Sequence, residues 1–179
     1  MAKLSYPRIR KALNDLAANE AVGGRSFSTA IAIDSDDTWL GTWSNEHMYV
    51  LVQASLADPT HNRTLIDVHA CGAYGLMPDA ELFETLTEAT WRLDYGGSWS
   101  RRQPDGKVAF GWRARYPSEL FHEENFAEAF GFLTGMIWEF GRVSLQLAEE
   151  LIPRHVGFLA RANDPNAWKA LLSGILPPE

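Results

Sequence analysis

Apolar and polar positions alternate along the chain in two distinct periods. In three stretches apolar residues recur every three or four positions, which predicts three amphipathic helices. Between these stretches apolar residues alternate with small or polar ones, or run continuously over short lengths between turn residues, which predicts strands. The predicted helices span about 5–21, 78–94 and 118–152, and the predicted strands span 27–33, 39–44, 48–55, 64–74, 99–103 and 108–116.

Turn residues set the connections between the predicted strands. The segments 34–37, 45–46 and 58–62 separate the first four strands by only a few residues. Sequential strands with such short connections predict an antiparallel meander. The Asp105-Gly106 pair is a strong hairpin-turn signal and joins the last two strands.

Two of the predicted strands alternate in a regular way. In 27–33, Phe27, Thr29, Ile31 and Ile33 alternate with smaller residues, which predicts a half-buried strand. The second strand of the hairpin alternates as cleanly, so its larger residues are expected to share one face of the sheet. These residues are Val108, Phe110, Trp112, Ala114 and Tyr116.

The long helix carries an apolar stripe along nearly its whole length. The stripe residues fall at alternating spacings of four and three, which resembles a heptad pattern. Gly131 and Gly135 share a face, so we expect another backbone, from the same chain or from a second subunit, to approach closely there. Pro153 is predicted to end the helix. The stripe consists of Phe126, Phe130, Leu133, Ile137, Phe140, Ser144, Leu147 and Leu151.

The order of these elements predicts the fold class. A helix, an antiparallel meander, a second helix, a β-hairpin and a long helix make an α+β domain, with helices packed on an antiparallel sheet. We assign this single domain to residues 1–153. Residues 154–179 form a C-terminal tail with one short helix, capped by Asn163 or Asp164.

Composition limits the classes of function. The 179 residues include 16 Lys and Arg against 23 Asp and Glu, a net charge of −7. An acidic balance argues against a general nucleic-acid partner. The single cysteine, Cys71, suits a reducing compartment, and no apolar segment long enough for a signal peptide or a membrane span is visible. We therefore expect a cytoplasmic protein with no membrane partner.

Few residues have catalytic potential. His69 and Cys71 lie two positions apart in one predicted strand, so they share a face and suggest a thiolate–imidazole pair. A lone cysteine near a core is more often a packing residue. The stretch 122–124 begins like a zinc-protease helix but lacks the second histidine. We predict no catalytic residue, no cofactor and no metal site.

One basic patch interrupts the acidic chain at the hairpin. With aromatic rings nearby, it suggests stacking on single-stranded nucleic acid, or cross-strand pairing with acidic residues on a solvated sheet face. An acidic segment of a partner protein suits it better. The patch contains Arg101, Arg102, Lys107, Arg113 and Arg115, beside Trp99 and Trp112. The predicted partner-binding residues are Trp99, Arg101, Trp112, Arg113, Arg115, Gly131, Gly135 and Trp138.

The chain resembles the YbjN-like family, whose members are similar to class I type III secretion chaperones. The order of elements carries the resemblance over about 150 residues, together with two short patterns around the hairpin. The departures are the aromatic and glycine-rich long helix and the tail. The residues concerned are Trp91, Leu93, Tyr95-Gly96, Trp99, Asp105-Gly106, Phe110, Trp112 and Tyr116-Pro117.

What this resemblance implies is a homodimer that binds other proteins and has no enzymatic residues. We therefore expect a non-catalytic protein-binding module, secretion-chaperone-like or adaptor, which binds an unknown partner protein through its sheet and aromatic-rich helix. The alternative is a small-ligand-binding or regulatory domain with a pocket between the sheet and the long helix. That pocket would be lined by Trp99, Trp112, Trp138 and Phe140.

Overall fold

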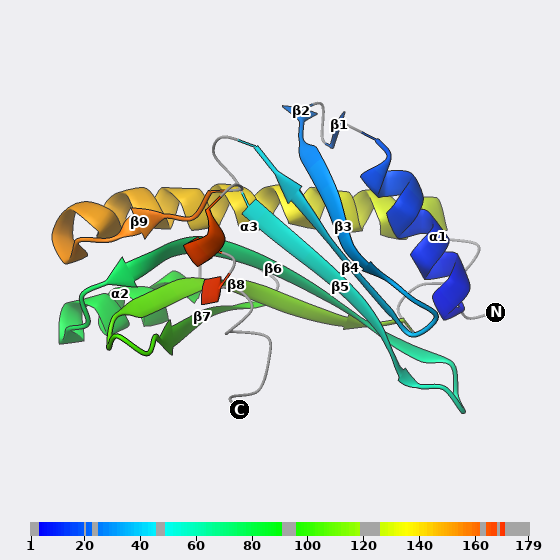
Figure 1. The fold of residues 1–179 in the computed structure, drawn as a ribbon, viewed down its shortest axis with the longest axis horizontal. Coiled ribbons are helices and arrows are strands. Elements are labelled where there is room, and N and C mark those ends of the chain that lie inside the picture. The colour runs from blue at the N-terminus through cyan, green and yellow to red at the C-terminus, as the bar shows by residue number, and fades with distance from the viewer. Residues whose placement is uncertain are drawn as a thin grey trace. The chain divides into compact units, whose positions relative to one another are not determined.

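A computed structural model describes residues 4–19, 21–22, 25–45, 49–90, 96–118, 126–161, 164–167 and 169–170 of the chain (Figure 1). Its helices are α1 (Tyr6–Ala17), α2 (Ala80–Ala89) and α3 (Phe126–His155), and a short C-terminal helix covers 165–167 and 169–170. Its strands are β1 (Ala21–Val22), β2 (Arg25–Ser26), β3 (Ser28–Asp34), β4 (Thr38–Ser44), β5 (Tyr49–Asp58), β6 (Arg63–Leu76), β7 (Gly97–Arg102), β8 (Val108–Pro117) and β9 (Phe158–Leu159).

The strands form one large antiparallel sheet and one small ribbon. The large sheet has the order β3-β4-β5-β6-β8-β7, and β9 pairs with β6 outside this path. The ribbon joins β1 to β2. The predicted α+β class is confirmed, with its meander, its hairpin, its long helix and its short C-terminal helix.

The chain divides into two compact units, and several strands and α3 contribute to both. The first unit comprises Met1–Trp43, Leu51–Val68 and Arg115–Trp138, and the second comprises Ser44–Val50, His69–Ala114 and Glu139–Glu179.

In the first unit α1 covers aromatic residues of β4. Its buried face presents Ile9, Leu13 and Leu16 at helical spacing, as predicted. The rings of Trp39 and Trp43 lie 5.8 Å apart and are fully buried. Gly41 lies between them in the strand, and a Cβ there would come 2.3 Å from the Trp39 ring, so only glycine leaves room for this ring.

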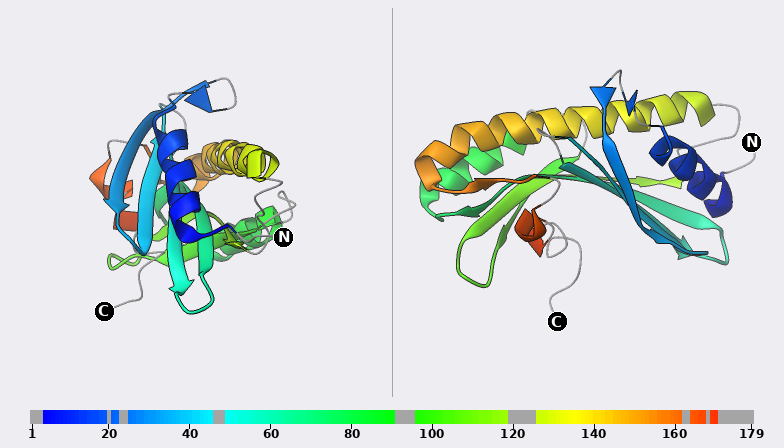
Figure 2. Two further views of the ribbon diagram at one scale, coloured as in Figure 1. Left: turned by 90° about the vertical axis from the view of Figure 1, so that its right-hand side faces the viewer. Right: turned by 45° about the horizontal axis from the view of Figure 1, so that its top comes forward.

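In the second unit α2 and the last part of α3 lie on one face of the strands, and the C-terminal helix lies on the other (Figure 2). Asp79 caps α2, because its side chain accepts a hydrogen bond of 2.8 Å from the Leu82 amide. Gly72 of β6 allows close contact with α3, since a Cβ there would lie 2.9 Å from the Ser144 carbonyl oxygen. The hairpin has the predicted turn, in which Gly106 has a φ of 83°.

Along α3 the predicted stripe is confirmed from Leu133 to Leu151, where every stripe residue is buried. The predicted end at Pro153 is wrong, because the helix continues to His155. Pro153 has no backbone N–H, so it cannot donate to the Glu149 carbonyl four positions earlier. Glu149 and Pro153 are both exposed, so water can hydrate this carbonyl. The predicted helix begins at about Ser118, and its residues 119–125 lie outside the described residues.

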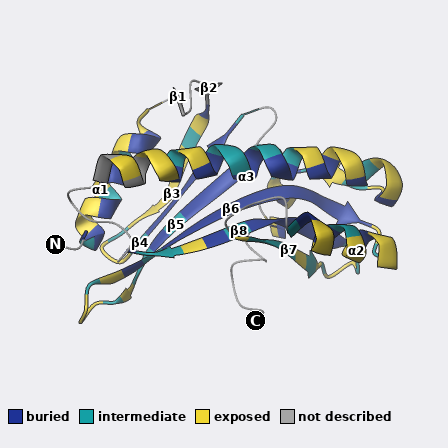
Figure 3. Cartoon of the chain, turned by 180° about the vertical axis from the view of Figure 1, so that it is seen from behind, coloured by how far each residue is buried: buried dark blue, intermediate teal, exposed yellow. Residues whose placement is uncertain are grey.

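Strand β3 departs from its predicted burial. Of the four alternating residues only Phe27, which precedes the strand, is buried. Ile31 and Ile33 are 45% and 42% exposed, and none of the seven residues of β3 is buried. Figure 3 shows β3 mostly in the colour of exposed residues, whereas β6 is almost entirely buried. Alternation tells which residues share a face, but it does not tell whether a second layer covers that face.

The tail docks on the second unit. Antiparallel pairing places Leu159 opposite Ala73 and Phe158 opposite Tyr74. The Ala160 amide donates to the Gly72 carbonyl at 3.1 Å, and the Tyr74 hydroxyl bonds to the Asp164 carboxylate. The predicted cap at Asp164 is confirmed, because its carboxylate accepts from the Asn166 amide at 2.8 Å.

Candidate functional site

The predicted partner-binding residues do not share one surface. In the second unit, Trp99 pairs with Gly111 and its ring lies over that glycine, 2.8 Å from where a Cβ would be. Trp112 pairs with Ser98 and points to the opposite face, where its side chain is fully buried. The prediction that Trp112 contacts a partner is therefore wrong, since Trp112 is a core residue. The two tryptophans also cannot stack on one strand of nucleic acid or line one pocket.

The basic residues of the hairpin have different environments. In the second unit, Arg101 and Arg113 are half-buried on the face of Trp99. In the first unit, Arg115 Nε lies 2.8 and 3.1 Å from the two carboxylate oxygens of Asp67, whose side chain is 4% exposed. This bond raises the pKa of the Arg115 guanidinium. Arg115 thus serves as a partner for a buried carboxylate of its own chain, as the cross-strand interpretation predicts.

The long-helix residues of the predicted surface also separate. Gly131 and Gly135 are exposed, and a Cβ at either position would have no atom of the described residues within 4 Å. The expectation that a backbone of the same chain packs against them is therefore wrong. Trp138 is half-buried, and its ring packs edge-on against Phe27 at 6.5 Å.

Cys71 lies in an environment that opposes nucleophilic chemistry. Its thiol donates to the Phe110 carbonyl at 3.9 Å, and burial, with a smaller contribution from Asp164, raises its pKa to about 12. A cysteine nucleophile needs the opposite, a stabilised thiolate. Within the described residues no three histidine, cysteine or acidic side chains gather as metal ligands.

This environment predicts an alkaline loss of stability. Because the folded state holds the Cys71 proton to about pH 12 and the unfolded state releases it near pH 9, the free energy of unfolding falls as pH rises between these values. The loss is about 1 kcal/mol per pH unit above 9. Tyr74, whose pKa burial raises from 10 to about 12, adds to this loss above pH 10. Urea denaturation at pH 7 and pH 10 measures the effect.

The control for this prediction is Cys71→Ala, which keeps the tyrosine contribution and loses that of the thiol.

In the native wild type we also expect the Cys71 thiol to resist a disulfide-exchange reagent at pH 8, and to react once urea unfolds the chain. Rapid labelling of the native protein would show that the thiol is accessible and ionised.

A surface that the sequence did not predict lies where α3 meets β9. We call it the junction patch and define it as Met77, Val156 and Phe158, which are 53%, 72% and 58% exposed. The Met77 amide donates to the His155 carbonyl at 2.8 Å, and the Phe158 ring stacks on Tyr74 at 5.5 Å. The segment that ends α3 therefore lies along the end of β6, and three large apolar side chains on these two segments are exposed.

The backbone at the centre of the junction patch is strained. Val156 has a φ of 48°, a left-handed conformation in which a β-branched residue is rare. The Val156 amide donates to the Ile152 carbonyl at 3.0 Å, so this residue occupies the helix-terminating position that glycine usually fills. At Asn62, the other non-glycine residue with a positive φ in the described chain, the side chain is of a type that tolerates it.

Charged residues border the junction patch. Arg154 Nη1 lies 3.1 Å from Glu81 Oε1, and both side chains are more than half exposed. Asp79, whose side chain is 54% exposed, has its Oδ2 atom 3.2 Å from Nδ1 of the buried His155 ring. An exposed apolar centre with a charged rim is typical of a protein–protein interaction surface.

Comparisons with known proteins give no relative. No family model, no curated protein and no solved structure matches the chain. The resemblance to the YbjN-like family thus stays a prediction. Among the described residues, no helix has both the length and the apolar character needed to cross a bilayer.

Proposed function

We propose that this chain is a non-catalytic protein-binding module, of the chaperone or adaptor kind, which binds its partner protein at the junction patch. The observation that carries this proposal is Val156, a strained and 72% exposed residue at the centre of three exposed apolar side chains. The surface that binds the partner thus differs from the hairpin surface that the sequence indicated.

Strain at an exposed position needs a compensating role. A left-handed conformation costs a non-glycine residue about 1–3 kcal/mol. Burial does not offset this cost here, because most of the Val156 side chain is in contact with solvent. Glycine or asparagine would remove the strain and lose little packing. A valine at this position is consistent with contact to a partner, where its apolar surface is removed from water.

The tail supplies the rigid support that such a surface needs. Pairing between β9 and β6 and the bond between Tyr74 and Asp164 fix the segment on both sides of Phe158. Gly157 lies against Leu76, 2.5 Å from where a Cβ would be, so the backbone between Val156 and Phe158 packs closely on β6. A pre-ordered surface loses less conformational entropy on binding than a mobile one.

The proposal predicts opposite effects of one substitution on stability and on binding. Val156→Asn is expected to raise the free energy of unfolding by about 1 kcal/mol, because it relieves the strain. It is expected to weaken partner binding, because it removes the central apolar contact. Urea denaturation gives the first result. Affinity capture of the tagged variant from native lysate, with quantitative mass spectrometry, gives the second.

Two further variants serve as controls. Phe158→Ser removes a neighbouring side chain of the junction patch and should weaken capture without raising stability. Phe132→Ser changes a 41% exposed aromatic residue of the first unit and should leave capture unchanged. Capture of the same partner by Val156→Asn and wild type in equal amounts would refute the proposal.

A further inference from the structure

Strand β3 is an edge strand without the usual features that prevent pairing. In the described chain β4 is its one neighbour in the large sheet. All seven residues are exposed or half-buried, and they include neither proline nor a basic residue. Natural proteins protect such edges with charges, prolines, bulges or covering segments. The other edge of the sheet, β7, carries Arg101 and Arg102.

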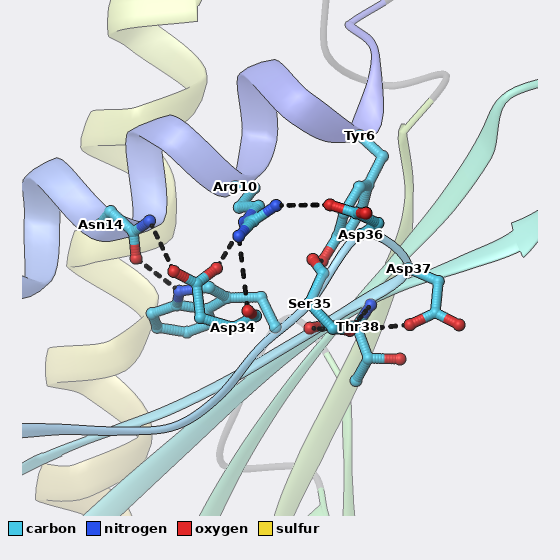
Figure 4. A network of polar contacts seen from close by, with 9 residues as sticks. Tyr6, Arg10, Asn14, Asp34, Ser35, Asp36, Asp37 and Thr38 are labelled. Atoms are coloured by element: carbon cyan, nitrogen blue, oxygen red, sulfur yellow. Dashed lines mark hydrogen bonds and ion pairs between the residues drawn. The ribbon is translucent and has the colours of Figure 1, made fainter.

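The one charge of β3 is neutralised within the chain. Asp34 forms an ion pair with Arg10 and accepts a hydrogen bond from Asn14 at 3.3 Å (Figure 4). The bond to Arg10 lowers the pKa of the Asp34 carboxyl. The charge of Asp34 is therefore already compensated by Arg10, and it does not repel a strand that pairs with β3.

The same network holds β3 in place. Arg10 Nη1 lies 3.0 Å from Asp36 Oδ1, and the Tyr6 hydroxyl donates to the Ser35 carbonyl at 3.0 Å. In Figure 4 these residues of α1 reach the turn between β3 and β4 side by side. The exposed edge is thus fixed by α1 and is not a frayed end, so its backbone is ordered before any partner arrives.

We infer that β3 pairs antiparallel with β3 of a second copy, about a two-fold axis at Ile31. This inference concerns the first unit and goes beyond the proposed function, which concerns the second. The sequence Ser-Thr-Ala-Ile-Ala-Ile-Asp is nearly symmetric about its centre. Closed two-fold contacts are by far the commonest in homo-oligomers.

The register follows from this symmetry. Pairing centred on Ile31 is the two-fold register in which all seven residues of each strand find an opposite residue. On one face Ile31 meets its symmetry mate and Thr29 meets Ile33, which are favourable β-branched pairs. On the other face Ala30 meets Ala32. Asp34 meets Ser28, so no like charges lie opposite one another.

The expected association is weak. Seven residues of strand span about 23 Å, and one such pairing buries less than the roughly 800 Å² per partner of a standard interface. We therefore expect a monomer–dimer equilibrium in the micromolar range. Sedimentation velocity between about 1 and about 200 µM should show a concentration-dependent sedimentation coefficient that approaches the dimer value.

Substitution at the axis tests the register. Ile31→Lys places two lysines opposite each other and should raise the dissociation constant at least about tenfold. Ile31→Glu alone should do the same. An equimolar mixture of the two variants should recover dimers, because lysine then meets glutamate. Phe132→Lys, an exposed substitution in the same unit, should leave the equilibrium unchanged.

The outcomes separate clearly. Circular dichroism first confirms that each variant is folded. The double variant Ala30→Lys/Ala32→Lys, which places lysines opposite each other on the other face of β3, replaces any that is not. Loss of dimers in each single variant and recovery in the mixture support the pairing at Ile31. A wild type that stays monomeric at the highest concentration, or an Ile31→Lys variant that dimerises as well as wild type, overturns it.

Discussion

Gly111→Ala is expected to lower the free energy of unfolding by more than about 3 kcal/mol, because among the glycines of the described residues Gly111 leaves the least room for a Cβ. A Cβ at this position would lie 1.9 Å from the Ala70 carbonyl oxygen and 2.8 Å from the Trp99 ring. The ring could shift, but the carbonyl belongs to the backbone of β6 in the middle of the sheet. Relief of the clash therefore requires the strands to separate.

The matched control is the same substitution on α3. A Cβ at Gly131 would meet no atom within 4 Å, so Gly131→Ala should raise stability by about 0.5–1 kcal/mol through helix propensity. Urea denaturation of both variants, at one pH and one temperature, gives the comparison. A loss below about 1 kcal/mol for Gly111→Ala would show that the two strands are not packed this closely.

Trp112→Ala is expected to lower the free energy of unfolding by about 3–5 kcal/mol. The side chain has no surface accessible to solvent, and its removal leaves a large cavity in the second unit. Loss of stability, and not loss of a binding contact, is thus the expected result of a substitution that the sequence alone would assign to a partner surface.

Trp112→Phe separates these two roles. Within the described residues the Trp112 indole N–H has no hydrogen-bond partner, so phenylalanine loses no such bond and keeps most of the packing. We expect a cost of less than about 1.5 kcal/mol, measured by urea denaturation, and unchanged capture of the partner protein. A stable Trp112→Phe variant that no longer captures the partner would show that Trp112 does contact it.

Local signals in the sequence predicted much of the fold. The hairpin followed from Asp105-Gly106, and the buried face of β8 followed from the alternation of Phe110 and Trp112. The stripe of α3 followed from its spacing. In each case the pattern reports a property of a few neighbouring residues, and the structure satisfies that property locally.

Other features depend on contacts between distant segments. Pairing of β9 with β6 joins residues that are far apart in the sequence: Phe158 and Tyr74 are separated by 84 positions, and Leu159 and Ala73 by 86. A two-residue strand also has no periodicity of its own. The exposure of Ile31 reflects the position of β3 at the end of the strand order, which alternation does not reveal.

The candidate site was the least predictable feature. Valine disfavours the left-handed conformation, so nothing local indicates that Val156 adopts it. Glycine stands one position later, at Gly157, and would suggest a helix end there. Only the packing of this segment on β6 shows why the glycine is needed at 157 and why the strain falls on Val156.

The most direct test of the proposed function is hydrogen exchange in the complex with the captured partner. We predict that amides of residues 155–160 and the neighbouring Met77 exchange more slowly in the complex than in the unbound chain, because the partner covers the junction patch. Protection elsewhere, for example on the β7–β8 hairpin, with unchanged exchange across 155–160, would contradict the proposal and return the partner surface to the basic patch.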